Sequence, residues 1–287
     1  MADEKRLDEA TGQHTTGHSY DGIEELNTPL PRWWLWTFYA TIVWGLIYTI
    51  AYPAWPLING ATAGFLGYST RGEVAKEIEA HEAANSDLVA QLVAADMSTL
   101  DASSDLHRYG VARGASVFRA QCSQCHGSGA AGAKGYPNLL DNNWLWGGTM
   151  EDIMYTVRHG IRNDQDDDAR YSEMPAFGEI LEAEEIEAVV AFIPTLAASE
   201  GGDADHPGAG VFADNCASCH GDAGKGDREQ GAPNLADAIW LYGGDPETLT
   251  ETVTYSRYGV MPAWGPRLRE EDVRAVSVYV HSLGGGE

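Results

Sequence analysis

The pentapeptide Cys122-Ser-Gln-Cys-His126 is repeated as Cys216-Ala-Ser-Cys-His220, 94 residues further along the chain. The pattern Cys-x-x-Cys-His is the sequence signature of covalent c-type haem attachment. Its two thiols are spaced to reach the two vinyl groups of one macrocycle, and the histidine that follows is placed to ligate the iron. The two motifs use all four cysteines of the 287 residues. We therefore predict two covalently bound haem c groups, held by Cys122, Cys125, Cys216 and Cys219, with His126 and His220 as iron ligands.

Two other uses of Cys-x-x-Cys are a zinc site and a redox-active dithiol. A zinc site would need the ligands of both motifs to converge on one ion. Neither use explains the histidine that follows the second cysteine of each motif. Haem attachment accounts for every one of these residues.

The repeat extends well beyond the two motifs. Pro137-Asn-Leu matches Pro233-Asn-Leu, Trp144-Leu matches Trp240-Leu, and Met174-Pro-Ala-Phe-Gly178 matches Met261-Pro-Ala-Trp-Gly265. Each repeat has amphipathic helical patterns and no long strand-like alternation. We expect an all-α chain whose soluble part is two tandem domains, 108–200 and 205–287, joined by the flexible segment 199–203.

Met174 and Met261 are the candidate sixth ligands of the two irons. They are the only methionines that occupy matched Met-Pro-Ala settings in the two repeats. A thioether opposite a histidine raises the reduction potential of a haem, as in electron-carrying cytochromes c. The simplest interpretation pairs each methionine with the haem of its own repeat, but an exchange between the repeats stays open at this stage.

Other matched residues are weaker candidates for haem contacts. The carbonyls of Pro137 and Pro233 are placed to accept the second ring N–H of each ligating histidine. Trp144, Trp240, Arg158 and Arg257 recur in both repeats, where they either bind haem propionates or serve as ordinary core and surface residues. Four histidines have no counterpart in the other repeat and are interpreted as surface or loop residues: His107, His159, His206 and His281. The aspartate-rich insertion between Gly160 and Met174 reads as a solvated loop.

One stretch of the sequence is apolar enough to cross a membrane. Trp33–Ala51 contains no charged residue, matches the roughly 20 residues that a spanning helix needs, and has aromatic residues at both ends. The alternatives are a buried core helix and a cleaved signal peptide; a signal peptide is disfavoured because 32 mostly acidic residues precede the stretch. We predict an N-terminal segment 1–32, a transmembrane anchor 33–55 whose helix is stopped by Pro53 and Pro56, and a connector 56–107.

The net charge of −25 excludes a nucleic-acid-binding function. The acidity is spread along the chain, because residues 111–200 and 201–287 each contain 14 acidic and 6 basic residues. Such a surface attracts basic partner proteins.

The segments around the anchor carry a more specific resemblance. Asn27-Thr-Pro-Leu-Pro-Arg32-Trp-Trp precedes it and Tyr52-Pro-Ala-Trp-Pro-Leu57 follows it. With the two haem motifs, they resemble the dihaem subunit (CcoP/FixP, subunit III) of cbb3-type cytochrome c oxidases. The resemblance implies two class-I-like cytochrome c domains. It also implies a subunit that performs no oxygen chemistry itself and passes electrons to a monohaem c subunit, and from there to the catalytic haem–copper subunit.

The location and the donor follow from the same line of reasoning. Haem c is attached on the outer side of the bacterial cytoplasmic membrane, so we expect a single-pass inner-membrane protein with periplasmic haem domains and a cytoplasmic N-terminus. The expected donor is a basic soluble or membrane-bound cytochrome c. The alternatives are a stand-alone anchored electron carrier to another reductase and, less favoured, a dihaem peroxidase, which needs an iron with an open sixth position.

Overall fold

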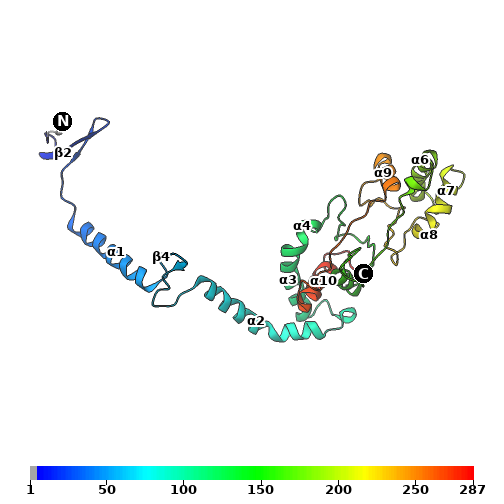
Figure 1. Cartoon of the computed structure of the whole chain (residues 1–287), viewed down its shortest axis with the longest axis horizontal. Helices are drawn as coiled ribbons and strands as arrows, with labels where there is room; N and C mark the ends of the chain where they lie inside the picture. Colours follow the sequence, from blue (N-terminus) through cyan, green and yellow to red (C-terminus); the bar gives the residue numbers. More distant parts are fainter. Residues whose placement is uncertain (1–4) are drawn as a thin grey trace. The chain divides into compact units, whose positions relative to one another are not determined.

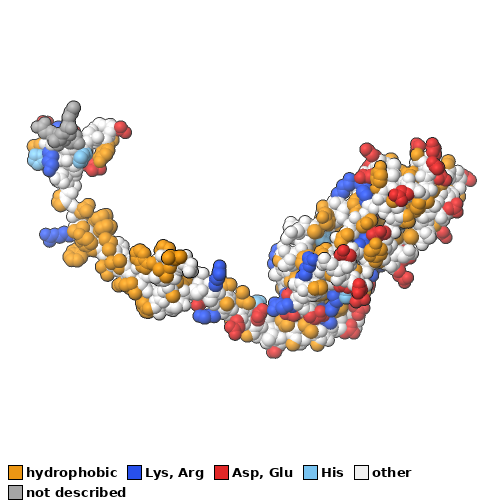
Figure 2. All heavy atoms as spheres, in the orientation of Figure 1, with side chains coloured by type: hydrophobic (Ala, Val, Ile, Leu, Met, Phe, Trp, Pro, Cys, Tyr) orange, Lys and Arg blue, Asp and Glu red, His pale blue; other side chains and the backbone are white. Residues whose placement is uncertain are grey.

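The computed structural model describes residues 5–287, and the chain forms two compact units. The first unit ends at Ala84, and the second comprises Asn85–Glu287. Both haem-attachment motifs lie in the second unit. Its surface carries acidic side chains over many elements, whereas hydrophobic side chains cover the long apolar helix of the first unit (Figure 2).

A small antiparallel sheet forms part of the first unit (Figure 1). Its strands, in the order β1-β2-β3, are Leu7–Asp8, Gln13–Tyr20 and Ile23–Leu26. Asp21 and Gly22 connect β2 to β3 with φ values of 51° and 85°, the positive pair that a type I′ hairpin turn requires. The expectation of an all-α chain is therefore wrong for this segment. The Asp-Gly pair is a hairpin signal, but it acts over too few residues to show as a long alternating pattern.

Helix α1 (Arg32–Ala51) is the one helix among the described residues that is long and apolar enough to cross a membrane. Its 20 residues span about 30 Å, the thickness of the hydrocarbon core of a bilayer. Aromatic rings stack near both ends, with Trp34 on Phe38 at 5.4 Å and Tyr48 on Tyr52 at 4.7 Å between ring centroids. The helix ends just before Pro53, as the sequence predicts.

A connector leads from α1 to the haem-motif region. It contains a two-stranded hairpin, β4 (Pro56–Leu57) and β5 (Gly60–Ala61), then the long charged helix α2 (Thr70–Ala94) and the short 3-10 helix η1 (Met97–Thr99). Most of α2 is exposed, but Leu92 near its end is buried.

The rest of the second unit is helical, with long loops between the helices. The first repeat contains α3 (Asp105–Val117), the π-helical turn η2 (Phe118–Cys122), α4 (Ser123–His126), α5 (Met150–His159), η3 (Phe177–Glu179), α6 (Ala183–Phe192) and η4 (Ile193–Ala197). The second contains α7 (Gly208–Asn215), α8 (Ala217–His220), α9 (Pro246–Tyr255) and α10 (Glu270–His281).

The last helix of each repeat packs in the other repeat. Helix α10 packs on α3 and α5, and α6 packs on α7 and α9 (Figure 1). At both crossings a glycine permits close approach of the two backbones: a Cβ at Gly114 would collide with the carbonyl of Ala275, and a Cβ at Gly208 with that of Ala188. The two repeats 108–200 and 205–287 therefore each contribute to both packed cores.

The same exchange is visible in the aromatic residues of the two cores. In the first core Phe118, fully buried, lies 5.4 Å from the ring of Tyr279. In the second core Phe212 lies 5.3 Å from the ring of Phe192. Phe118 and Phe212 occupy matched positions of the repeats, so the two cores are built on one plan, each from parts of both repeats.

Candidate haem-binding sites

The first haem-attachment motif lies at the edge of a cavity of about 420 Å³. The turn η2 and helix α4 carry Cys122, Cys125 and His126 along one side of this first cavity. Met261, from the second repeat, lies among its other lining residues. Two thiols, an imidazole and a thioether therefore line the same space, which is the donor set that a covalently attached haem with His–Met ligation requires.

A second cavity, of about 200 Å³, is lined by the same kinds of donor groups. Cys216, Cys219 and His220 line it from α8 and the end of α7, and the methionine among its lining residues is Met174 of the first repeat. The donor set therefore fits a haem in this cavity as well.

Each motif histidine is oriented by a backbone carbonyl. His126 Nδ1 lies 3.0 Å from the carbonyl oxygen of Pro137, and His220 Nδ1 lies 3.0 Å from that of Pro233. A carbonyl only accepts, so Nδ1 carries the proton and donates, which leaves the Nε2 lone pair for a metal. Burial lowers the pKa of both imidazoles, and the hydrogen bond to the carbonyl opposes this effect. The net effect lowers the pKa of both imidazoles, which favours the neutral form that is able to bind a metal.

The first cysteine of each motif is half-buried beside its cavity. Burial, with a smaller contribution from Cys125, raises the pKa of Cys122 to about 11. Burial, with a smaller contribution from Cys219, does the same for Cys216, also to about 11. Reactive redox cysteines have lowered thiol pKa values, so the surroundings of Cys122 and Cys216 differ from those of a redox-active dithiol.

Met261 reaches the first cavity because its segment lies along the end of α5. Ile161 N–H donates to the Met261 carbonyl at 2.9 Å, and Met261 N–H donates to the Ile161 carbonyl at 3.0 Å. Three residues later, Trp264 N–H donates to the Val157 carbonyl at 3.0 Å. Gly160 has a φ of 76°, and a Cβ there would collide with the Met261 carbonyl. The absence of a side chain at Gly160 therefore allows the Met261 segment to lie against the end of α5.

Met174 reaches the second cavity in the corresponding way. The hydroxyl of Ser256, just after α9, donates a hydrogen bond to the Met174 carbonyl. The following turn η3 packs against α9, where Gly178 lies close to Thr254. The cavity of His126 is thus lined by Met261 and the cavity of His220 by Met174, so each cavity contains the methionine of the other repeat.

The weaker candidates for haem contacts do not all line the cavities. Pro137 and Trp144 line the first cavity, and Pro233, Trp240 and Arg257 line the second. The Trp144 indole N–H donates to the Gly285 carbonyl, so that donor is committed to the C-terminal backbone. Arg158 does not line the first cavity, and its guanidinium pairs with Glu270 at 2.7 Å. Neither cavity is lined by any of His107, His159, His206 and His281.

Arg162 is the residue that the sequence interpretation missed. It lies in the insertion between Gly160 and Met174, for which the sequence predicts a solvated loop, yet it lines both cavities. The alignment of the two repeats contains a signal that sets Arg162 apart. Arg158-His-Gly-Ile-Arg162 matches Arg257-Tyr-Gly-Val-Met261, so the insertion begins at the position that the other repeat gives to its methionine.

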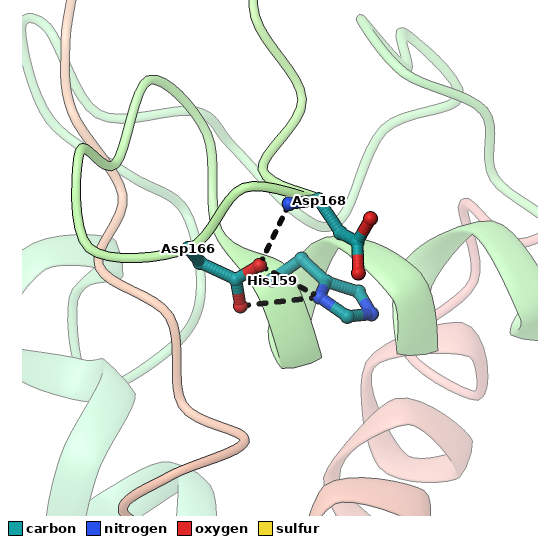
Figure 3. A group of neighbouring side chains, drawn as sticks. All are labelled: His159, Asp166 and Asp168. Carbon is teal, nitrogen blue, oxygen red and sulfur yellow. Dashed lines mark hydrogen bonds and ion pairs between the residues drawn. The ribbon is translucent and has the colours of Figure 1, made fainter.

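The insertion is tied to α5 by a group of polar side chains (Figure 3). The Asp166 carboxylate accepts hydrogen bonds from His159 Nδ1 at 3.1 Å and from the Asp168 backbone N–H at 2.9 Å. The Tyr155 hydroxyl donates to the Asp168 carbonyl at 2.8 Å. One ligand atom from each of His159, Asp166 and Asp168 lies within 4.8 Å of the others, and these hydrogen bonds account for their proximity. The group therefore holds the loop that carries Arg162.

Family models match the chain near its N-terminus and over both repeats. Residues 12–59 match the N-terminal domain of cytochrome oxidase-cbb3, FixP. Residues 110–193 and 203–280 each match cytochrome c oxidase, cbb3-type, subunit III.

Full-length relatives agree with these matches. The cbb3-type cytochrome c oxidase subunit CcoP of Cereibacter sphaeroides is 59% identical over 276 residues, covering 95% of both chains. Subunit FixP of Sinorhizobium medicae is 50% identical over 291 residues, covering all of both chains. Subunit CcoP of Rhodobacter capsulatus is 52% identical over 285 residues, covering 95% of this chain and 96% of the relative.

Proposed function

Because this chain belongs to the CcoP/FixP family of cbb3-type cytochrome c oxidase subunits, we propose that it carries electrons through two haem c groups whose axial ligands are exchanged between its repeats. Membership makes it a haem c-binding, membrane-associated electron-transfer subunit of that oxidase. The observation that carries the proposal is the pair of cavities, each lined by one Cys-x-x-Cys-His motif and by the methionine of the other repeat.

In this proposal Cys122 and Cys125 hold one haem, and Cys216 and Cys219 hold the other. The iron of the first has His126 and Met261 as ligands; that of the second has His220 and Met174. A bound haem accepts and releases one electron at its iron. The chain keeps both imidazoles neutral through Pro137 and Pro233, and a thioether opposite each imidazole favours a high reduction potential. A methionine in each cavity supports an electron carrier over a peroxidase, whose iron needs an open position.

The remaining parts of the proposal concern assembly. Helix α1 crosses the bacterial inner membrane once, with the N-terminus in the cytoplasm and the haem domains in the periplasm. The anchor keeps the haem domains beside a monohaem c subunit and the catalytic haem–copper subunit. The acidic surface receives electrons from a basic cytochrome c donor (Figure 2).

The test is purification from membranes in mild detergent, followed by haem quantification and identification of the accompanying subunits. We expect two haems per chain that resist acid–acetone extraction, one after replacement of Cys216 and Cys219 by alanine, and co-purification with an oxygen-reducing complex. Extractable haem would overturn the covalent attachment. Isolation without oxidase subunits would favour a stand-alone carrier.

The orientation has its own test. Protease added to spheroplasts should remove the haem domains. Protection there, with cleavage in inverted vesicles, would reverse the proposed topology.

A further inference from the structure

The two candidate haem cavities are neighbours that share part of their lining. The residues that line both are Leu145, Arg162, Leu241, Tyr242, Tyr258 and Gly259. Arg162 is the one cationic residue in this shared wall. It is also the one lysine or arginine that lines the first cavity. A single guanidinium therefore lies between two sites that each take an anionic, propionate-bearing cofactor.

The Arg162 side chain is bound only to neutral partners among the described residues. Nε donates to the Ser172 carbonyl at 2.6 Å, and Nη1 donates to the Gly259 carbonyl at 2.9 Å. The guanidinium carbon lies 5.5 Å from the centre of the Tyr258 ring. A guanidinium has five N–H donors, so these contacts leave donor capacity and the full positive charge.

Neighbouring arginines differ in this respect. Arg158 pairs with Glu270 at 2.7 Å, Arg170 with Asp152 at 3.0 Å, and Arg257 with Glu251 at 2.6 Å. Among residues 5–287, no carboxylate oxygen lies within 4.0 Å of a guanidinium nitrogen of Arg162. Burying a cation without an anion is costly, and burial lowers the pKa of Arg162. Glu173, in the lining of the second cavity, acts on the Arg162 charge without forming such an ion pair. The half-buried guanidinium therefore has no ion-pair partner among the described residues.

The backbone holds Arg162 in place at some conformational cost. Its φ is 52°, in the left-handed region that residues with a side chain rarely adopt. Its N–H donates to the Arg170 carbonyl at 2.8 Å, which closes the base of the insertion, and the preceding Ile161 pairs with Met261. Non-glycine residues with such backbone strain cluster at functional sites. The guanidinium is thus fixed relative to one of the proposed axial ligands.

We propose that Arg162 binds propionate groups of both haems and so couples the two sites electrostatically. This inference rests on the proposed function, because it requires a haem in each cavity. The planar fork of a guanidinium suits carboxylates in particular. A nearby positive charge stabilises the ferrous state, which has one positive charge fewer at the iron, and therefore raises the reduction potential. Arg162 raises both potentials, whereas an arginine that serves one haem raises only one.

The experiment is an optical redox titration of the purified, full-length, haem-loaded chain. In Arg162→Gln we expect two haems per chain and a fall in both midpoint potentials. In Arg162→Lys, which keeps the charge but loses the fork, we expect smaller falls at both haems. The matched control is Arg158→Gln, because Arg158 lines neither cavity and is neutralised by Glu270; its potentials should equal those of the wild type.

If either Arg162 variant changes the midpoint potential of only one haem, or of neither, the proposal is overturned. If Arg162→Gln fails to assemble, Arg162→Lys decides by the same criterion. A wild-type chain with fewer than two covalent haems would instead refute the proposed function, so the two failures are distinguishable.

Discussion

Ile161 and Met261 belong to different repeats, yet they pair through two backbone hydrogen bonds of 2.9 and 3.0 Å. This pairing brings a candidate ligand of the second repeat to the cavity that contains His126. The first cavity is therefore built from residues of both repeats.

The exchange predicts which methionine affects which haem. In a chain that carries only the first haem, because Cys216 and Cys219 are replaced by alanine, Met261→His should lower the remaining potential, since a thioether raises it relative to a second imidazole. Met174→His in the same chain is the matched control and should leave that potential unchanged. The measurement is a redox titration. A potential that responds to Met174→His and not to Met261→His would establish pairing within each repeat.

Removing the second repeat should disable the first haem site. A fragment of residues 85–205 keeps Cys122, Cys125 and His126 but lacks Met261 and α10, which cover Phe118 and the rest of the first core. We expect a poorly folded fragment whose ferrous haem binds carbon monoxide, because its sixth position is empty. The comparison is residues 85–287, which should not bind it. A stable, six-coordinate fragment would contradict the exchange.

Glu270 should contribute to the docking of α10 in a pH-dependent way. Burial acts to raise its pKa, but hydrogen bonds from Arg274 and Arg158 outweigh burial and lower the pKa below its ordinary value of 4.5. Its stabilising contribution is therefore present above about pH 4.5 and is lost as the pH falls through the lowered value.

Glu270→Gln tests this contribution. At pH 7 we expect a loss of about 1 kcal/mol, because the pairs are partly exposed, and a smaller loss under acid conditions. Urea unfolding at several pH values measures it. Glu187→Gln, at an exposed position of α6, is the control and should change little. Equal losses at all pH values would exclude the ionised carboxylate as the cause.

Electron entry should depend strongly on salt. Residues 111–200 and 201–287 each have an excess of acidic residues, so a basic soluble donor is attracted at long range. Raising the ionic strength from 0.1 M to 1 M shortens the Debye length from about 10 Å to about 3 Å. Stopped-flow reduction of the complex by such a donor should slow accordingly, while transfer between subunits held together by the anchor should change little. Entry rates that are insensitive to salt would indicate an uncharged docking surface.

The candidate haem-attachment motifs are recognisable in the sequence because their chemistry is local. The five residues Cys122–His126 contain two thiols and an imidazole at fixed covalent spacing, and no distant contact is needed to recognise them. The apolar run that forms α1 is likewise legible from composition. The N-terminal hairpin was missed because its signal is confined to Asp21-Gly22 between short strands. Arg162 was missed because a charged residue in an acidic insertion resembles any solvated loop residue.

The two Cys-x-x-Cys-His motifs, the repeat, the candidate ligands and an apolar helix long enough to cross a membrane can all be recognised in the sequence alone. The position of each methionine in its cavity and of Arg162 between the cavities depends on the tertiary structure. The physical reason is the similarity of the repeats: α6 and α10 have the same kind of apolar face, and Met174 and Met261 have the same local sequence. Local propensities therefore cannot distinguish the two arrangements. The choice depends on long-range packing, in which Gly114 and Gly208 admit the exchanged helices and Gly160 admits the segment that carries Met261.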